Sequence, residues 1–146
     1  IYGPRQGLDQ AIPKFILQSL NHKTITIYGD GTQTRDYTYV DDAVRAYALL
    51  GLTPKIEGMT INFGSGKEIQ IKRLAELIIN LTKTNTKLHF SKKLRGGETP
   101  RLLCTPTLAK KVTGWEPLVD LETGLCQTIA YYRQRKNLIE NLPFML

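Results

Sequence analysis

Hydrophobic residues recur along the first half of the chain at spacings that alternate between those of helices and those of strands. An amphipathic helix ending near Asn21 is predicted by apolar residues at three- and four-residue intervals: Ile12, Phe15, Ile16 and Leu20. Residues 24–28 (Thr-Ile-Thr-Ile-Tyr) then alternate β-branched and aromatic side chains, which predicts a strand. Gly29 and Gly31 follow and supply the positive-φ positions of a tight turn.

The second half of the chain continues the alternation. A helix capped by Asp41 or Asp42 is predicted to run through Leu50, with an apolar stripe formed by Val40, Val44, Tyr47 and Ala48. Residues 59–63 have the composition of a buried strand, and a third helix is predicted by Ile71, Leu74, Ala75, Ile78 and Leu81. A strand at 87–90, a short helix at 108–112 and a last helix are also expected, the last from Leu121, Leu125, Ile129 and Tyr132. This order predicts an α/β fold without internal repeats.

Length and composition limit the alternatives. The chain has 146 residues, 41% of them hydrophobic, which suits one globular domain. Its first residues lack a Met, a charged segment and an apolar stretch, so we expect a start within a longer protein rather than a signal peptide. No apolar run approaches the ~20 residues that cross a bilayer, and two distant cysteines suit a reducing setting, so a soluble cytoplasmic protein is expected.

Charge and histidine content argue against two further classes of ligand. The net charge is +7, from 20 basic and 13 acidic residues, but the basic residues are dispersed and are not interleaved with aromatic residues. Nucleic acid is therefore not the expected partner. Neither histidine has a cysteine or carboxylate at metal-ligand spacing, so no metal is expected.

Two segments could bind an anion. In residues 29–36 a tight turn precedes Arg35, whose planar guanidinium can hold a phosphate at two points; the alternative is a hairpin turn with a solvated arginine. In residues 95–98 two glycines separate Arg95 and Glu98, which could contact a phosphate and a ribose hydroxyl; the alternative is a flexible surface loop. Arg101 could substitute for Arg95.

Other patterns that suggest chemistry are incomplete. Gly64-Ser65-Gly66 lies between a predicted strand and a helix, but Ile69 stands where a dinucleotide fingerprint has its third glycine. No hydrolase triad is evident, and Asp41 with Asp42 is better explained by helix capping than by paired acid-base chemistry.

Read in order, several short segments resemble those of extended short-chain dehydrogenases/reductases that modify nucleoside-diphosphate sugars. The matching segments are residues 2–6 (Tyr-Gly-Pro-Arg-Gln), 12–15, 28–36, 39–42, 62–66, 95–98, 114–117 and 121–125. The resemblance extends over residues 1–135 and corresponds to the C-terminal part of that family. It implies the substrate-binding lobe and the last elements of a Rossmann-type fold over residues 1–146, with the NAD-binding N-terminal half absent.

The resemblance also implies roles for particular residues. Arg35 and Arg95 would contact the diphosphate, Glu98 would contact the ribose, and Asn62 would lie near the diphosphate. Pro13, Ile25, Ile27 and Tyr28 would form walls around the base. The family's catalytic Tyr and Lys are expected before residue 1, so we interpret Tyr132 and Lys136, which have the Tyr-x-x-x-Lys spacing, as a chance match.

The implied function is an NAD-dependent nucleotide-sugar epimerase or dehydratase, most simply a UDP-hexose 4-epimerase, whose C-terminal part alone is expected to be inactive. A dTDP-glucose 4,6-dehydratase and a UDP-glucuronate decarboxylase share these segments and stay open as alternatives. A stand-alone nucleotide-binding or interaction module is the alternative outside enzymology. The expected partners are a nucleoside-diphosphate sugar and, through exposed apolar edges, a second copy in a homodimer, but neither nucleic acid nor a membrane.

Overall fold

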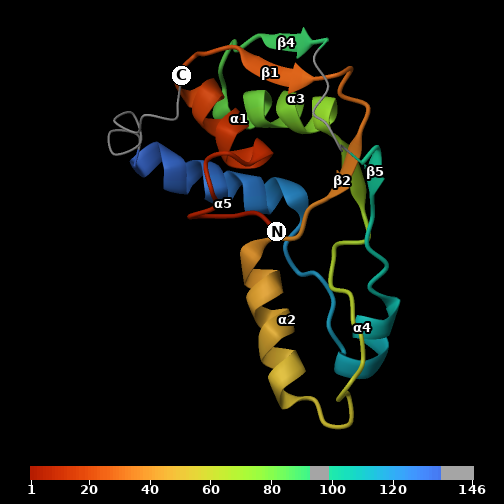
Figure 1. Cartoon of the computed structure of the whole chain (residues 1–146). Helices are drawn as coiled ribbons and strands as arrows, with labels where there is room; N and C mark the ends of the chain where they lie inside the picture. The colour runs from red at the N-terminus through yellow and green to blue at the C-terminus, as the bar shows by residue number, and fades with distance from the viewer. Residues whose placement is uncertain (93–98, 136–146) are drawn as a thin grey trace.

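The computed structural model describes residues 1–92 and 99–135 and has the predicted α/β character. The elements fall into a larger and a smaller region at opposite ends of the molecule (Figure 1). A small sheet lies between the two regions. Within the described residues, no helix is long and apolar enough to cross a membrane.

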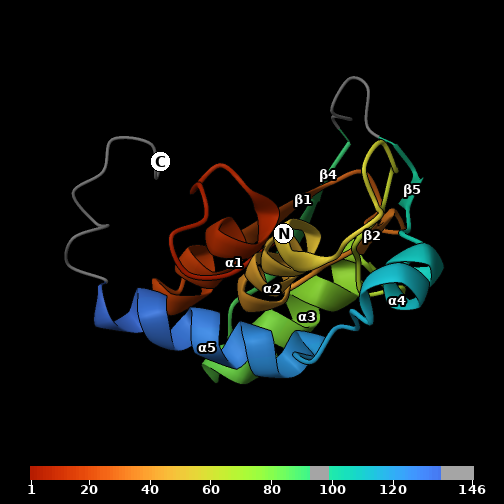
Figure 2. The ribbon, with the colours of Figure 1, turned by 90° about the horizontal axis from the view of Figure 1, so that it is seen from below.

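The larger region is built from α1 (Ala11–Leu20), α3 (Ile71–Thr82) and α5 (Leu121–Gln134), which lie side by side (Figure 2). Beside them, β1 (Ile25–Tyr28) pairs in parallel with β4 (Leu88–Ser91). These elements confirm three of the five predicted helices and two of the predicted strands. We call their shared interior the main core; its largest fully buried side chains include Tyr2, Ile12, Ile16, Leu17, Ile25, Ile27, Leu74, Ile78, Leu125 and Tyr132.

Local chemistry explains where α5 begins. The side chain of Asp120 accepts a hydrogen bond from the Thr123 backbone N–H at 2.8 Å and so satisfies one of the free donors at the helix start. Tyr2 packs against the same helix and donates its hydroxyl proton to the Leu121 carbonyl at 3.1 Å. Gly124 allows this approach, because a Cβ there would lie 2.1 Å from the Tyr2 hydroxyl oxygen.

A three-stranded sheet that the sequence pattern did not predict links the two regions. Its central strand, β2 (Thr34–Asp36), pairs antiparallel with β3 (Glu68–Gln70) and in parallel with β5 (Arg101–Leu102). These strands have two or three residues each and are largely polar, so they carry no alternating apolar signal. Because β1 and β2 belong to different sheets, the turn between them does not make a hairpin.

The smaller region, which we call the α2/α4 arm, consists of α2 (Val40–Leu52), α4 (Thr107–Thr113) and the segments that join them to the sheet (Figure 1). Its interior is a small cluster of Ala46, Ala109 and Trp115, with Leu49, Ile61 and Phe63 packed around it. The predicted buried strand at 59–63 is wrong: these residues form no strand, and Met59 is exposed. A strand needs a hydrogen-bonding neighbour, and no described segment pairs with this one.

Two predictions for α2 are also wrong. Neither Asp41 nor Asp42 caps the helix, because the N-cap residue is Tyr39 and it makes no side-chain cap. Most of the predicted apolar stripe faces solvent instead of the core: Val44 is 61% and Tyr47 71% exposed, and Ala48 is also exposed, whereas Val40 packs against the main core. Leu52, at the end of the helix, is 80% exposed as well. The buried face of α2 is formed by Asp42, Ala43 and Ala46.

The buried Asp42 carboxylate binds the backbone of the segment that follows α4. Its carboxylate accepts hydrogen bonds from the Leu118 N–H at 3.0 Å and the Val119 N–H at 3.0 Å, and it pairs with Arg45 at 2.5 Å. Burial alone would raise the pKa of this carboxyl, but the two backbone donors and Arg45 hold the pKa below its usual value. Asp42 is therefore a structural anion rather than a helix cap.

Candidate nucleotide-binding cavity

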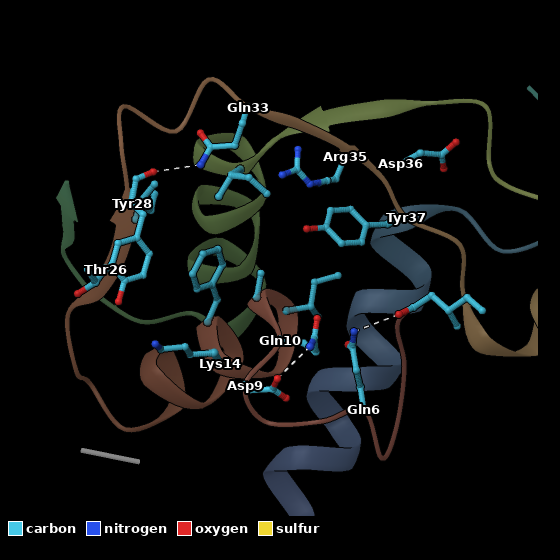
Figure 3. Close-up of a pocket in the computed structure, with 16 residues that line it drawn as sticks. Gln6, Asp9, Gln10, Lys14, Thr26, Tyr28, Gln33, Arg35, Asp36 and Tyr37 are labelled. Carbon is cyan, nitrogen blue, oxygen red and sulfur yellow. Dashed lines mark hydrogen bonds between the residues drawn. The ribbon is translucent and has the colours of Figure 1, made fainter. Parts of the chain in front are cut away.

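A cavity of about 390 Å³ opens between α1, β1, β2 and the start of α3 (Figure 3). Residues from five separate segments meet on its wall: Ile1, Gln6, Asp9, Gln10, Ala11, Ile12, Lys14, Phe15, Thr26, Ile27, Tyr28, Gln33, Arg35, Asp36, Tyr37 and Ile71. Polar and charged side chains make up most of this wall and apolar ones the rest, so the cavity suits a polar ligand better than a purely apolar one.

One wall of the cavity is formed by β1. Ile25 and Ile27 are buried, at 0% and 1% exposure, whereas Thr26 and Tyr28 are half-buried on the cavity side. Of the residues proposed for the walls around a base, Tyr28 and Ile27 lie on the cavity, but Pro13 and Ile25 are buried and do not line it. Thr26 was missed, although the two-residue period of a strand places it on the same face as Tyr28.

Arg35 projects into the cavity from β2, opposite β1 (Figure 3). Its Nη1 donates a hydrogen bond to the Thr34 carbonyl at 2.7 Å, which holds one terminal nitrogen of the guanidinium group against the backbone. The neighbouring strand positions hold this side chain in register, because Arg35 lies opposite Ile69 of β3 and Leu102 of β5. The structure thus places Arg35 where a ligand in the cavity would meet a fixed positive charge.

Tyr37 is a second polar residue on this wall, and sequence reasoning missed it. Its hydroxyl points into the cavity on the same side as the Arg35 guanidinium (Figure 3). Burial raises the pKa of Tyr37 to about 12, against the opposing effect of the Arg35 charge. The hydroxyl therefore keeps its proton at neutral pH and can donate a hydrogen bond to an anion. The signal available in the sequence was its position two residues after Arg35, on the same side of an extended chain.

A second cavity of about 510 Å³ adjoins the first, and the two share Ile1 and Asp36. Asn62, proposed to lie near a diphosphate, is exposed on this second cavity and not on the first. Thr38, Phe63, Gly64 and Cys104 also line it. The structure therefore does not bring Asn62 and Arg35 onto one wall.

The Gly64-Ser65-Gly66 loop already holds an anion that belongs to the chain. The Asp36 carboxylate accepts hydrogen bonds from the Ser65 N–H at 3.0 Å and the Gly66 N–H at 2.9 Å. The Cys104 N–H adds a third, at 3.2 Å. A Cβ on Gly64 would lie 2.3 Å from the Cys104 Cβ, so the glycine is needed for close packing. The Ser65 and Gly66 N–H groups are therefore already used within the chain and are not available to a dinucleotide phosphate.

Arg101 is the member of the second proposed anion site that the structure describes. Arg95 and Glu98 lie outside the described residues. Arg101, the suggested substitute for Arg95, forms an ion pair with Glu68, with its Nε 2.8 Å from Oε2, and does not line the first cavity. Its hydrogen bonds lower the pKa of the Glu68 carboxyl. Arg101 thus joins β5 to β3 in the small sheet.

Tyr132 has a structural role. It is buried in the main core and donates its hydroxyl proton to the Gln6 carbonyl at 3.0 Å. Burial raises the pKa of Tyr132 to about 12, so the hydroxyl is poorly suited to act as a base. Lys136 lies outside the described residues. Among those that are described, no three His, Cys, Asp or Glu side chains are grouped to hold a metal ion.

Comparison with known proteins gives a consistent set of relatives. The family model described as GDP-mannose 4,6 dehydratase matches residues 1–128. An uncharacterized UDP-glucose epimerase of Bacillus subtilis is 35% identical over 131 residues, covering 90% of this chain and 41% of that protein. A UDP-N-acetyl-alpha-D-glucosaminuronate decarboxylase of Bacillus cytotoxicus is 37% identical over 145 residues, covering 94% of this chain and 45% of that protein.

A solved structure agrees in fold as well as in sequence. The UDP-glucuronic acid 4-epimerase of Bacillus cereus, in complex with UDP-glucuronic acid and NAD, superimposes with a TM-score of 0.85 at 34% identity. The match covers 91% of this chain and 42% of that one. The chain thus spans less than half the length of the relatives it matches.

Proposed function

Because the chain belongs to the GDP-mannose 4,6 dehydratase family of extended short-chain dehydrogenases/reductases, we propose that it forms the nucleotide-sugar-binding part of an NAD-dependent epimerase. The simplest activity for the longer protein is epimerisation at C4 of a UDP-hexose. We propose that the NAD-binding half and the catalytic Tyr and Lys belong to a portion that precedes Ile1. Residues 1–146 would then bind and orient the nucleotide without catalysing the reaction.

The observation that carries this proposal is the pairing of Arg35 and Tyr37 on one wall of the cavity, facing β1 on the other (Figure 3). A nucleoside diphosphate has an anionic end and a flat, apolar end, and the two walls offer a match for each. The fixed charge of Arg35 would bind the diphosphate, with the Tyr37 hydroxyl as a second donor. The base would lie against Thr26 and Tyr28.

The other family-derived roles stay part of the proposal. Arg95 would share the diphosphate, Glu98 would accept from the ribose, and Asn62 would approach the ligand from the second cavity. The segment that carries Arg95 and Glu98 connects β4, which pairs with β1, to β5, which pairs with β2. Arg95 and Glu98 lie outside the described part of the chain, and their roles are proposed from the family resemblance alone.

We propose that the Gly64-Ser65-Gly66 loop does not hold NAD. The backbone N–H groups that could hold its pyrophosphate, at Ser65 and Gly66, are already bonded to Asp36. We therefore assign NAD to the portion that precedes Ile1, and we propose that this portion covers the exposed face of α2. Val44, Tyr47 and Leu52 form that face, and an apolar stripe of this kind marks a docking surface.

Ligand binding tests the proposal directly. Titrating the chain with UDP and following NMR chemical shifts should show saturable binding that perturbs residues 26–37. Arg35→Gln should weaken UDP binding at least tenfold, because hydrogen bonds to charged groups contribute about 1.5–3 kcal/mol. Arg101→Gln is the matched control, since Arg101 lies in the same sheet but is paired with Glu68. Equal losses in both variants, or no UDP binding by the parent chain, would refute the assignment.

Product analysis of the longer protein separates the possible activities. With NAD and UDP-glucose, epimerisation should give a C4-inverted UDP-sugar, whereas a dehydratase would give a 4-keto-6-deoxy product and a decarboxylase would release CO₂ from a UDP-uronic acid. The decarboxylase alternative has a specific basis in the 37% identity to the Bacillus cytotoxicus enzyme. Robust turnover by residues 1–146 alone would contradict the proposed division of labour.

A further inference from the structure

Gln33 connects the two walls of the cavity. Its Nε2 donates a hydrogen bond to the Tyr28 carbonyl, at 3.0 Å, where β1 ends (Figure 3). Its backbone carbonyl accepts from the Ile71 N–H, also at 3.0 Å, where α3 begins. Two residues further along the chain, Arg35 projects from β2 into the same cavity. Gln33 thus lies on the cavity wall between the residues proposed to contact the base and the diphosphate.

The turn that Gln33 closes is held by its own internal bonds. Gly29 and Gly31 take left-handed conformations, with φ of 73° and 77°. The Asp30 carboxylate accepts from the Thr32 N–H at 3.0 Å and from the Thr32 hydroxyl at 2.7 Å. The Lys72 N–H donates to the Gly31 carbonyl at 3.0 Å, which ties the turn to α3. The hydrogen bond from the Gln33 side chain to the Tyr28 carbonyl joins the two ends of this turn.

No strand pairing joins the two walls in the described part of the chain. β1 pairs with β4 in one sheet, and β2 pairs with β3 and β5 in another. The separation between Tyr28 and Arg35 is therefore set by the turn, by the bond that closes it and by α3, which begins beside the turn and packs against β1. We propose that Gln33 is a positioning residue that sets the spacing between the nucleoside wall and the diphosphate-binding arginine. This proposal rests on the proposed function.

The physical consequence is specific to ligands that reach both walls. When one wall has bound its part of such a ligand, the other part is presented to the second wall at a high effective concentration. That gain depends on the distance between the walls. The affinity of a ligand that contacts only one wall does not depend on this distance, so a substitution at Gln33 should leave that affinity unchanged.

Three ligands separate this role from a general effect on folding. UDP spans both walls, uridine contacts only the nucleoside wall, and inorganic pyrophosphate contacts only the Arg35 side. We expect Gln33→Met, which keeps the side-chain length but removes the amide, to weaken UDP binding about tenfold in NMR titrations of the chain. This corresponds to about 1.4 kcal/mol. Binding of uridine and of pyrophosphate should each change less than twofold.

A second variant and a control make the result decisive. Gln33→Asn keeps the amide but is one methylene too short to reach Tyr28, so it should give the same split and replaces Gln33→Met if that variant folds poorly. Gln70→Met changes an exposed glutamine that lies opposite Thr34 and does not line the cavity, and all three affinities should stay unchanged.

Two results would overturn the positioning role while the proposed function stands. One is an equal loss for all three ligands in the Gln33 variants, and the other is no loss for any of them. Failure of the parent chain to bind UDP would instead refute the proposed function, and the positioning role with it.

Discussion

The main core and the α2/α4 arm are built from the same chain but differ in how completely they are enclosed. Three helices and a strand pair surround the main core, and its largest apolar side chains are fully buried. In the arm, the buried cluster is limited to Ala46, Ala109 and Trp115, while the apolar stripe of α2 faces solvent. The apolar side chains of the main core are buried by other parts of the same core. The arm instead leaves apolar side chains of α2 exposed, as in a layer that packs against a further part of a protein.

This difference shows what holds each region together. Apolar burial dominates in the main core, because large side chains from distant segments meet there. The arm depends on a few polar anchors around one aromatic residue: the Trp115 Nε1 donates to the Asp42 carbonyl at 3.0 Å, and the Asp42 carboxylate holds residues 118 and 119. The arm should therefore open locally at a lower free energy than the main core.

The largest expected effect comes from emptying the arm's cluster. Trp115 is fully buried and packs edge-to-face against Phe63, with ring centroids 5.2 Å apart. Trp115→Ala should cost about 3–5 kcal/mol of local stability. Hydrogen exchange should accelerate in residues 40–63 and 105–118, while protection in α1, α3 and α5 persists.

Leu74→Ala is the matched change in the main core, where Leu74 is fully buried. It should accelerate exchange throughout the chain, because the arm has no core large enough to fold alone. If Trp115→Ala also removed protection from α1, α3 and α5, the two regions would form a single cooperative unit and the comparison would be wrong.

The second effect concerns the buried anion of the arm. Asp42→Asn removes the charge that the Leu118 N–H, the Val119 N–H and Arg45 stabilise, so it should lower the free energy of unfolding at pH 7 by about 1.5–3 kcal/mol. The pKa of Asp42 is lowered in the folded state, so its contribution exists above the unfolded pKa of about 3.9 and is lost as pH falls through and below that value.

Urea denaturation from pH 7 to pH 3 measures this contribution. The gap between the parent chain and Asp42→Asn should be widest near neutrality and should close below about pH 4. Asp41→Asn, on the exposed neighbour, should leave no such gap. A gap that stayed constant over the whole range would assign the loss to altered packing rather than to charge.

A third and smaller effect is expected at the junction of the two regions. Gly64→Ala would bring a methyl group within 2.3 Å of the Cys104 Cβ, so the loop must shift, at a cost of about 1–3 kcal/mol. Thermal unfolding should show the loss. Adding Cys104→Gly should recover part of it, because the closest clashing atoms are then removed; no recovery in the double variant would show that the strain arises elsewhere.

The smallest effect on stability is expected on the open face of α2. Tyr47→Ser should change the free energy of unfolding by no more than about 0.5 kcal/mol, since the side chain is 71% exposed. The same change should weaken association with the separately produced NAD-binding part, which size-exclusion chromatography or fluorescence titration can measure. Unaltered association would show that another surface receives that part.

The sequence predicted the main core more accurately than the α2/α4 arm. In the main core, apolar periodicity predicted α1, α3 and α5 because those residues are buried by partners within the chain. In α2 the same reasoning predicted the helix but assigned the wrong buried face, because Val44 and Tyr47 form a periodic stripe that no described residue covers. The strand predicted at residues 59–63 was wrong for a related reason, since a strand-like composition produces a strand only where a neighbouring strand pairs with it.

For the site, the sequence predicted the turn before Arg35, and the structure places Arg35 on a cavity wall, while its contact with a ligand stays a prediction. It did not predict the contributions of Thr26, Tyr37 and Gln33, because these depend on which face of a short strand or turn meets the cavity. The role of the Gly64–Gly66 loop could not be predicted either. Its partner, Asp36, is 29 residues away from Ser65 in sequence, and no local pattern reports that contact.

The bonds from Tyr2 to Leu121 and from Tyr132 to Gln6 have a consequence for biosynthesis. They join residues that are 119 and 126 positions apart, so neither can form until the ribosome has released the segment that becomes α5. Until then, α1 and α3 expose the apolar surface that α5 later covers. The nascent chain should therefore depend on chaperones most strongly just before residue 132 emerges, and truncations within α5 should aggregate rather than fold partially.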